Sequence, residues 1–302
     1  MSPKLLPDYF RPVNRRPRPV TKTDRRTILR STAEETQALL PGILSVVPQA
    51  PPTAQYCPRS RYPALNPRFS PKLSTYVEVL FGDTFDIAIR LSNHVRQFRQ
   101  SDMQNVCVLN MANERNPGGG WLNGAMAQEE ALCYRSSLSS TLKRRYYPIG
   151  QRDSIYSPTV VVFRESFTQG HGLMDLQKPE LLPVVSVISV AALEEPEVDD
   201  STTPPSYKHS SDRDLTKDKM RTILRISGYK KHRRIVLGAL GCGAFANPNA
   251  EVAECWSEVL QEREFQGWWE KIVFAVLDDM SKVAQGDSNF DVFRERLHGL
   301  KV

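Results

Sequence analysis

The sequence predicts an α/β sandwich, a sheet with helices on both faces. Short runs rich in valine and isoleucine, the composition of strands buried on both sides, recur between residues 76 and 277. Segments of helical length lie between them, and strands that alternate with helices give this layered architecture. With 302 residues and 40% hydrophobic content, the chain is long enough to bury a sizeable core.

Three regions follow one another along the chain. Residues 1–24 are expected to be a disordered basic tail, because prolines punctuate a segment with little to bury. Residues 25–72 are expected to be an accessory segment packed on the core. It begins with a helix over 25–40, stopped by Pro41 and Gly42, and continues as an extended proline-rich stretch. Residues 73–302 form the core, and the chain is a single domain overall.

The core is expected to alternate strands and helices. The predicted strands cover residues 76–81, 106–110, 160–163, 184–191, 235–240 and 272–277. The predicted helices cover residues 84–99, 127–142, 216–228, 248–263 and 290–297. Residues 194–214 are acidic and rich in serine, threonine and proline, which predicts a surface loop.

The excess positive charge lies in the first quarter of the chain. The net charge is +6, to which residues 1–72 contribute +9 and residues 73–302 contribute −3. A polyanionic partner would be attracted to the basic segment, and nucleic acid binding is expected only there. A solvated basic tail, or a nuclear-import patch over residues 11–18, explains the same charge equally well.

Composition argues against membrane and zinc proteins. The longest apolar run, residues 183–193, is too short for a bilayer span, and no apolar signal segment follows the start. We therefore expect no membrane association and an intracellular location, nuclear or cytoplasmic. The five cysteines lack CxxC spacing, which indicates reduced thiols and argues against a zinc site. No metal and no cofactor is expected.

Three consecutive glycines, Gly118, Gly119 and Gly120, form the first candidate binding element. They follow the predicted strand 106–110, at the edge where open α/β sheets bind ligands. Without Cβ atoms, their backbone N–H groups are free to face a polar ligand. Taken alone, the triplet is better explained as a tight connection that needs positive φ angles.

Gln128, Glu129 and Glu130 follow the glycines after seven residues and begin a predicted helix. Successive helical residues project about 100° apart, so the two carboxylates cannot face each other but suit two contacts with one sugar. Cleavage of a glycosidic bond needs a carboxyl group as proton donor. Acidic pairs at helix N-termini are usually solvated surface. Their short distance from the glycine triplet favours the functional interpretation here.

These motifs resemble those of the microbial-type poly(ADP-ribose) glycohydrolases, which are built on a macrodomain. The resemblance lies in the stretch Asn110–Asn113, the glycine triplet and Gln128–Glu130, together with a second glycine-rich loop over residues 237–245. It extends over residues 26–297. It implies a macrodomain-like three-layer α/β/α sandwich with a mixed sheet and an N-terminal helical and extended accessory segment.

The resemblance also implies residue roles. Glu130 would be the general acid and base, and Glu129 would orient ribose hydroxyls. Asn113 would bind the distal ribose, and the glycine triplet and Gln128 would complete that side of the site. The second loop would bind the diphosphate and cover the distal ribose, through Gly241, Cys242, Gly243, Ala244 and Phe245. No histidine lies near Cys242 in sequence, which argues against thiol catalysis.

The function implied is hydrolysis of ribose–ribose O-glycosidic bonds in poly(ADP-ribose), mainly from the chain end, releasing ADP-ribose. The partners implied are poly(ADP-ribose), ADP-ribose and ADP-ribosylated proteins, with a place in the DNA damage response. A mono-ADP-ribosyl hydrolase or a non-catalytic ADP-ribose reader are alternatives, and the carboxylate at Glu130 argues against the reader. Asp83 either contacts adenine or caps the following helix.

Overall fold

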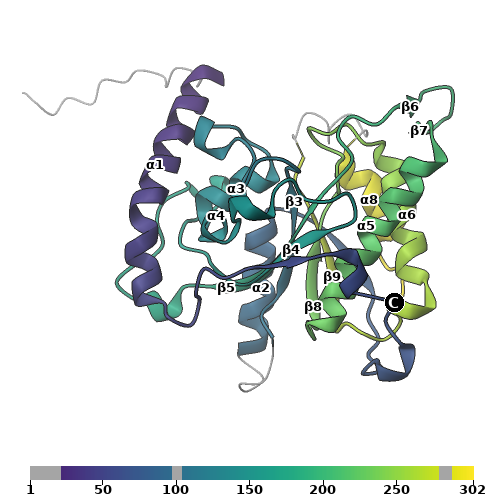
Figure 1. Cartoon of the computed structure of the whole chain (residues 1–302), viewed down its shortest axis with the longest axis horizontal. Helices are drawn as coiled ribbons and strands as arrows, with labels where there is room; N and C mark the ends of the chain where they lie inside the picture. The colour runs from purple at the N-terminus through teal and green to yellow at the C-terminus, as the bar shows by residue number, and fades with distance from the viewer. Residues whose placement is uncertain (1–21, 97–103, 279–287) are drawn as a thin grey trace, which may run out of the picture.

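The computed structural model describes residues 22–96, 104–278 and 288–302. Most of the predicted basic tail, residues 1–21, lies outside them. A seven-stranded sheet runs through the molecule, with helices on both faces (Figure 1). This confirms the predicted α/β sandwich. No helix in the described ranges is long and apolar enough to cross a membrane.

The strands are ordered β1-β4-β5-β3-β8-β9-β2 across the sheet. The pairs β1–β4 and β4–β5 are antiparallel, and all pairs from β5 to β2 are parallel, so the sheet is mixed as predicted. The strand bounds are Gln55–Cys57 (β1), Val77–Phe81 (β2), Cys107–Ala112 (β3), Ser154–Val161 (β4), Val184–Ala191 (β5), Arg234–Leu237 (β8) and Lys271–Val276 (β9).

The two faces of the sheet feed two apolar cores, because successive strand residues point to opposite sides. In β3, Cys107 and Leu109 belong to one core and Val108 to the other. The first core lies under α5 (Ser210–Tyr229), α6 (Asn249–Gln261) and α8 (Asn289–Leu297). The second lies under α2 (Thr84–Arg96), α3 (Gln128–Arg135) and α4 (Leu138–Thr141). Strands buried on both faces explain the valine- and isoleucine-rich runs.

The first helix is longer than the sequence predicts. Helix α1 spans Lys22–Val46 and contains Pro41, so the prediction that Pro41 and Gly42 stop it is wrong. Proline inside a helix removes one hydrogen bond and crowds the preceding turn. Here Leu40 and Ile43, on either side of the proline, are buried in a third apolar cluster with Phe163. Tertiary burial of that turn outweighs the local cost.

Other boundaries differ from the prediction too: β4 begins at Ser154 instead of 160, and β8 ends at Leu237 instead of 240. The helix expected over 127–142 is two helices, α3 and α4, because Ser136 is extended and forms an isolated bridge with Val162. The acidic stretch 194–214 is not only loop: it contains a two-strand ladder, β6 (Val198–Asp199) and β7 (Ser206–Tyr207), and the start of α5. The break between α3 and α4 arises from a pairing between residues distant in sequence, whereas β6 and β7 form a local hairpin.

Helix α1 packs against the segment that follows the glycine triplet. Leu29 and Ala33 lie in the same apolar core as Trp121 and Tyr134. The Arg26 side chain donates to the carbonyl oxygen of Asn123 at 2.9 Å. The helix therefore supports the loop between the glycines and α3, on the flank of the molecule where Figure 1 shows it.

We expect Leu29→Ala to lower the free energy of unfolding by about 2–4 kcal/mol, because Leu29 is only 2% exposed and its removal leaves a cavity. The matched control is Ile28→Ala at a side chain that is 56% exposed, with an expected change within about 0.5 kcal/mol. Urea unfolding of both variants measures the difference. Equal, small losses would mean that α1 is not docked on the core in solution.

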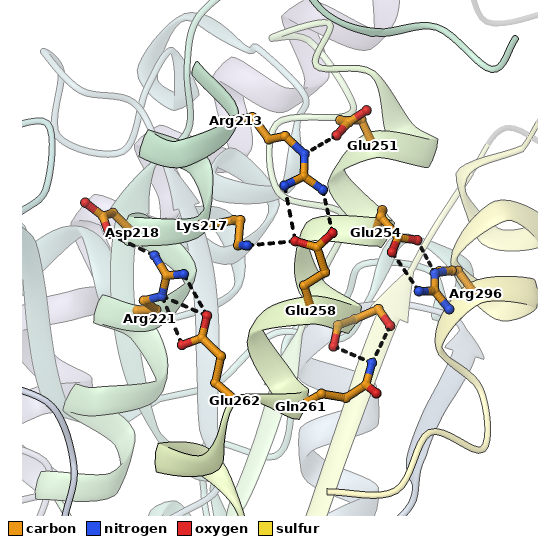
Figure 2. A network of polar contacts seen from close by, with 11 residues as sticks. Arg213, Lys217, Asp218, Arg221, Glu251, Glu254, Glu258, Gln261, Glu262 and Arg296 are labelled. Atoms are coloured by element: carbon orange, nitrogen blue, oxygen red, sulfur yellow. Dashed lines mark hydrogen bonds and ion pairs between the residues drawn. The ribbon is translucent and has the colours of Figure 1, made fainter. Parts of the chain in front are cut away.

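A row of ion pairs joins α5 to α6 and α6 to α8 (Figure 2). Arg213 pairs with Glu251 and, at 2.7 Å, with Glu258, which also accepts from Lys217 at 2.7 Å. Arg221 pairs with Glu262 at 2.6 Å. Partly exposed pairs contribute little energy individually, so the row mainly fixes how the helices lie against each other. It thereby orients α6, whose first residue closely follows the second glycine-rich loop.

Candidate active site

The site lies where the sheet divides at its carboxyl edge. β3 pairs with β8 only at Cys107 and Val108, and the two strands diverge beyond that point. From β3 the chain continues to strands on one side, and β8 leads to β9 on the other, so this is a switch point of the kind where α/β sheets bind ligands. A cavity of about 300 Å³ opens there. Its walls are Met111, Ala112, Met126, Ala127, Gln128, Ala192, Ala239, Gly241, Gly243, Ala244, Phe245, Val276, Leu277 and Asn289.

Gln128 closes the gap that β8 leaves along β3. Along a strand, the backbone N–H and C=O groups of successive residues point to alternate sides. Val106 O accepts from Ser186 N of β5. The backbone groups of Leu109 and Met111 therefore point to the other side of β3, toward β8. Gln128 Nε2 donates to Leu109 O at 2.8 Å, and its Oε1 accepts from Met111 N at 2.9 Å. The Gln128 amide thus replaces a strand and anchors α3 to the sheet. Its side chain lines the cavity while engaged with the protein.

Glu129 is buried against the end of β3, with 3% of its surface exposed. Its carboxylate accepts from Asn113 N at 2.7 Å and from Asn110 Nδ2 at 3.1 Å. Burial is the main cause that raises the pKa of Glu129 to about 8, against the lowering effect of these hydrogen bonds. Glu129 therefore holds the loop after β3 and is a group that titrates near neutral pH.

Asn110 begins the stretch that carries the resemblance, but the sequence prediction gave it no role of its own. It is fully buried on β3, and its Nδ2 also donates to Ser189 Oγ of β5 at 3.0 Å, which fixes the amide that holds Glu129. The signal for it was present in the sequence, since an asparagine in an otherwise apolar strand must find buried partners.

Glu130 follows Glu129 on the same helical turn and is 8% exposed. Its carboxylate accepts from Gly120 N at 2.8 Å and, as the third residue of α3, from Ala127 N at 2.9 Å. The second contact is half of a capping box, so the residue also serves the helix start. The structure brings the glycine triplet and the glutamates together: Glu130 binds the triplet directly.

Gly119 shows why the triplet needs glycine. Its φ is +59°, and a Cβ at this position would overlap Glu130 Oε1 and lie 3.3 Å from Glu129 Oε2. The backbone therefore approaches both carboxylates closely only because no side chain intervenes. The tight-turn explanation of the triplet requires a positive φ, and the binding explanation requires a close approach of the backbone. Gly119 meets both requirements.

The second loop forms a row of backbone donors on the opposite wall of the cavity. Within the described part of the chain, the N–H groups of Gly241, Gly243 and Ala244 have no hydrogen-bond acceptor. A Cβ at Gly243 would meet nothing within 4 Å, so this stretch borders open space. Unpaired N–H groups of consecutive loop residues form an anion-binding concavity. The arrangement suits a diphosphate.

Asn247, also missed by the sequence prediction, holds this loop in shape. Its Nδ2 donates to Leu193 O at 2.7 Å, to Phe245 O at 3.1 Å and to Gly241 O at 3.2 Å. Its Oδ1 accepts from Tyr207 Oη at 2.7 Å. A side chain buried to 95% (5% exposed) with every polar atom paired fixes a loop rigidly.

The predicted site residues divide into two groups. Five line the cavity, namely Gln128, Gly241, Gly243, Ala244 and Phe245. The other seven do not line it, namely Asn113, Gly118, Gly119, Gly120, Glu129, Glu130 and Cys242. The Asn113 side chain accepts from Arg115 N and Asn116 N, so it shapes its own turn. Burial raises the pKa of Cys242 well above its usual range, which agrees with the absence of a thiolate nucleophile.

Asp83 takes the capping geometry that the sequence left open. Its Oδ1 accepts from Phe85 N at 2.8 Å and Asp86 N at 3.2 Å, and the carboxylate pairs with buried Arg135. Asp83 does not line the cavity. Among the residues that the structure describes, no group of three or more histidine, cysteine, aspartate or glutamate side chains could hold a metal ion.

The fold and site define a macrodomain-like α/β protein with a buried glutamate pair and a loop of unpaired backbone N–H groups. Residues 49–165 match the family model of the microbial-type PARG catalytic domain, where PARG denotes poly(ADP-ribose) glycohydrolase. The resemblance predicted from the sequence is therefore confirmed. A search of curated proteins finds no match.

Solved structures of such enzymes are similar over most of the chain. Poly(ADP-ribose) glycohydrolase from Thermomonospora curvata superposes with a TM-score of 0.74 at 26% identity, over 89% of this chain and 99% of that one. The same enzyme bound to the inhibitor ADP-HPD gives 0.72 at 27% identity, with the same coverage. A mutant of the Deinococcus radiodurans enzyme in complex with ADP-ribose gives 0.64 at 27%, over 81% of this chain and 94% of that one.

The raised pKa of Glu129 predicts a specific pH dependence of stability. Because its pKa is about 8 in the folded chain against 4.5 ordinarily, the folded state binds more protons than the unfolded state between these values. This contribution to the free energy of unfolding therefore falls as pH rises. Between pH 5 and 8 we expect the wild type to lose on the order of 2–4 kcal/mol more than Glu129→Gln, which cannot ionise.

Urea unfolding of both proteins at four pH values measures this difference. Glu180→Gln at an exposed carboxyl is the matched control and should follow the wild-type curve. Parallel curves for wild type and Glu129→Gln would show that Glu129 stays ionised in the folded chain.

Proposed function

We propose that this chain is a poly(ADP-ribose) glycohydrolase that hydrolyses ribose–ribose O-glycosidic bonds and releases ADP-ribose. The observation that carries the proposal is one cavity with two chemically distinct walls. Gln128 on one wall adjoins Glu129 and Glu130, and the unpaired amides of Gly241, Gly243 and Ala244 form the other. A carboxyl group beside an anion site is what cleavage next to a diphosphate requires.

In the proposed reaction, the loop amides hold the diphosphate of the terminal unit and Phe245 packs on its distal ribose. Glu130 donates a proton to the 2′-oxygen of the leaving ribose as the bond from that oxygen to the anomeric carbon breaks. The oxocarbenium-like ribose that forms is stabilised by the adjacent diphosphate. Water then adds to the anomeric carbon and gives its proton to Glu130, which restores the acid.

Glu129 supports this step by geometry. Its contacts with Asn113 N and Asn110 Nδ2 fix the loop after β3, which supports the proposal that its carboxyl group orients ribose hydroxyls. Asn110 acts through Glu129 and is a positioning residue.

Cleavage mainly from the chain end is part of the proposal, and it rests on the resemblance to the microbial-type glycohydrolases. The accessory segment does not supply a cavity wall, because none of its residues, 25–72, lines the cavity. Analysis of product length separates the modes. Free ADP-ribose from the first turnovers indicates exo cleavage, whereas early oligomers indicate endo cleavage.

The test of the substrate class offers wild-type protein poly(ADP-ribose) and a mono-ADP-ribosylated protein in parallel. We expect free ADP-ribose from the polymer and little from the mono-modified protein. Release only from the latter favours the mono-ADP-ribosyl hydrolase, and binding of ADP-ribose without release from either favours the reader. ADP-ribosylated proteins, an intracellular location and a place in the DNA damage response remain part of the proposal.

A nucleic acid partner is proposed only for the basic first quarter. Binding that falls steeply with salt and is absent after removal of residues 1–72 would support it.

A further inference from the structure

Three exposed arginines, Arg115, Arg144 and Arg145, lie together beside the loop that Glu129 holds. Arg144 Nη1 donates to the carbonyl oxygen of Arg115 at 2.8 Å, which joins two segments 29 residues apart. The Arg145 guanidinium lies over the Tyr146 ring, 5.1 Å from its centroid. We call these three arginines the basic rim.

The basic rim has no counter-ion among the described residues, although residues 73–302 carry more carboxylates than cations. Arginines on α5 are instead paired with glutamates, as Figure 2 shows for Arg213 and Arg221. Burial lowers the pKa of the Lys219 amine, and the charge of Glu114, the carboxyl on the same loop as Arg115, partly offsets this lowering. Glu114 forms no ion pair with the rim in the described ranges. Three neighbouring positive charges without partners repel one another, and a polyanion would relieve that repulsion.

The basic rim lies close to the reacting groups but outside the cavity. Asn113 N is 2.7 Å from the Glu129 carboxylate, and Arg115 follows two residues later, a reach of at most about 7 Å. None of the three arginines lines the cavity, whose wall on this side ends at Ala112 and Gln128. Glu129 therefore has two contacts. Through Asn110 it contacts β3, whose end lines the cavity, and through Asn113 it contacts the loop that leads to the rim.

We propose that the basic rim binds the diphosphate of the ADP-ribose unit that remains on the polymer after cleavage. The inference rests on the proposed function. With the terminal unit in the cavity and the scissile bond at Glu130, the proposal places the next unit across the loop that carries Arg115, because this loop is held by the neighbouring Glu129. Guanidinium groups bind phosphate oxygens with paired, charge-assisted hydrogen bonds. The rim would thus favour a polymer over a single ADP-ribose.

The test uses the double variant Arg115→Gln/Arg145→Gln and leaves Arg144, which donates to the loop backbone. We expect KM for poly(ADP-ribose) to rise about tenfold, with a weaker dependence on salt, because two exposed phosphate contacts are lost. The kcat and the Kd for free ADP-ribose should change less than about twofold, since both depend on the cavity and Glu130. The matched control is Arg68→Gln/Arg263→Gln, two exposed arginines remote in the fold without an ion pair in the described ranges.

Two results would overturn the rim proposal while the enzyme remains a glycohydrolase. One is an unchanged KM and salt dependence, equal to the control. The other is an equal loss of free ADP-ribose binding, which would put these arginines in the terminal-unit site. If the wild-type chain releases no ADP-ribose from polymer, the proposed function itself fails and the rim proposal fails with it.

Discussion

Glu130→Gln is expected to lower kcat on poly(ADP-ribose) at least about 10³-fold, because an amide cannot transfer the proton that the leaving 2′-oxygen needs. The amide oxygen can still accept from Gly120 N or Ala127 N, the two contacts that position the wild-type carboxylate. The loops and the cavity should therefore keep their shape. The Kd for ADP-ribose, measured calorimetrically, should stay within about threefold of wild type.

Glu129→Gln provides the comparison for this variant. In this variant Glu130, the proton donor, is unchanged, so we expect a smaller loss of turnover. The loop at Asn113 should be positioned less firmly, because Asn113 N donates to Glu129. Equal activity of wild type and Glu130→Gln would exclude Glu130 as the proton donor, whatever the binding data show.

Gly119→Ala is expected to reduce turnover at least about 100-fold with a stability loss near 1 kcal/mol, because an alanine at φ +59° is strained and its Cβ overlaps the Glu130 carboxylate. The carboxylate ends a flexible side chain and is able to move away. Moving would break its bond to Gly120 N and displace the acid, so the effect falls on activity more than on folding.

The matched control is Gly42→Ala in α1, where a Cβ meets nothing within 4 Å. It should leave kcat unchanged and keep or slightly raise stability, as alanine favours a helix over glycine. Steady-state kinetics and urea unfolding of both variants measure the two effects. A fully active Gly119→Ala protein would mean that the glycine and Glu130 are not in contact in solution.

The strands of this fold were predictable where burial on both faces makes the local pattern complete. Residues 184–191 are mainly apolar, and β5 has the predicted bounds. Predictions failed where a distant contact outweighs local preference. Pro41 indicates a helix end by itself, but the turn around it is buried against Phe163 from another part of the chain. Ser136 interrupts a helical pattern because it pairs with Val162.

The active site shows the same division. The glutamates and both glycine-rich loops are contiguous motifs and could be found by spacing. The residues that shape them are single asparagines. Asn110 and Asn247 act through contacts across 19 and 54 residues, to Glu129 and to Leu193 O, and no local spacing specifies such pairs. The role of Gln128 as a substitute strand also depends on where β3 and β8 diverge.

The measurement that tests the central claim most directly is a crystal structure of Glu130→Gln with a short poly(ADP-ribose) chain. The account predicts the terminal diphosphate on the amides of Gly241, Gly243 and Ala244. It also predicts the scissile glycosidic oxygen within about 3 Å of the side chain at position 130, the reach of a general acid. A terminal unit bound outside this cavity, or a scissile bond too far for position 130 to reach, would contradict it.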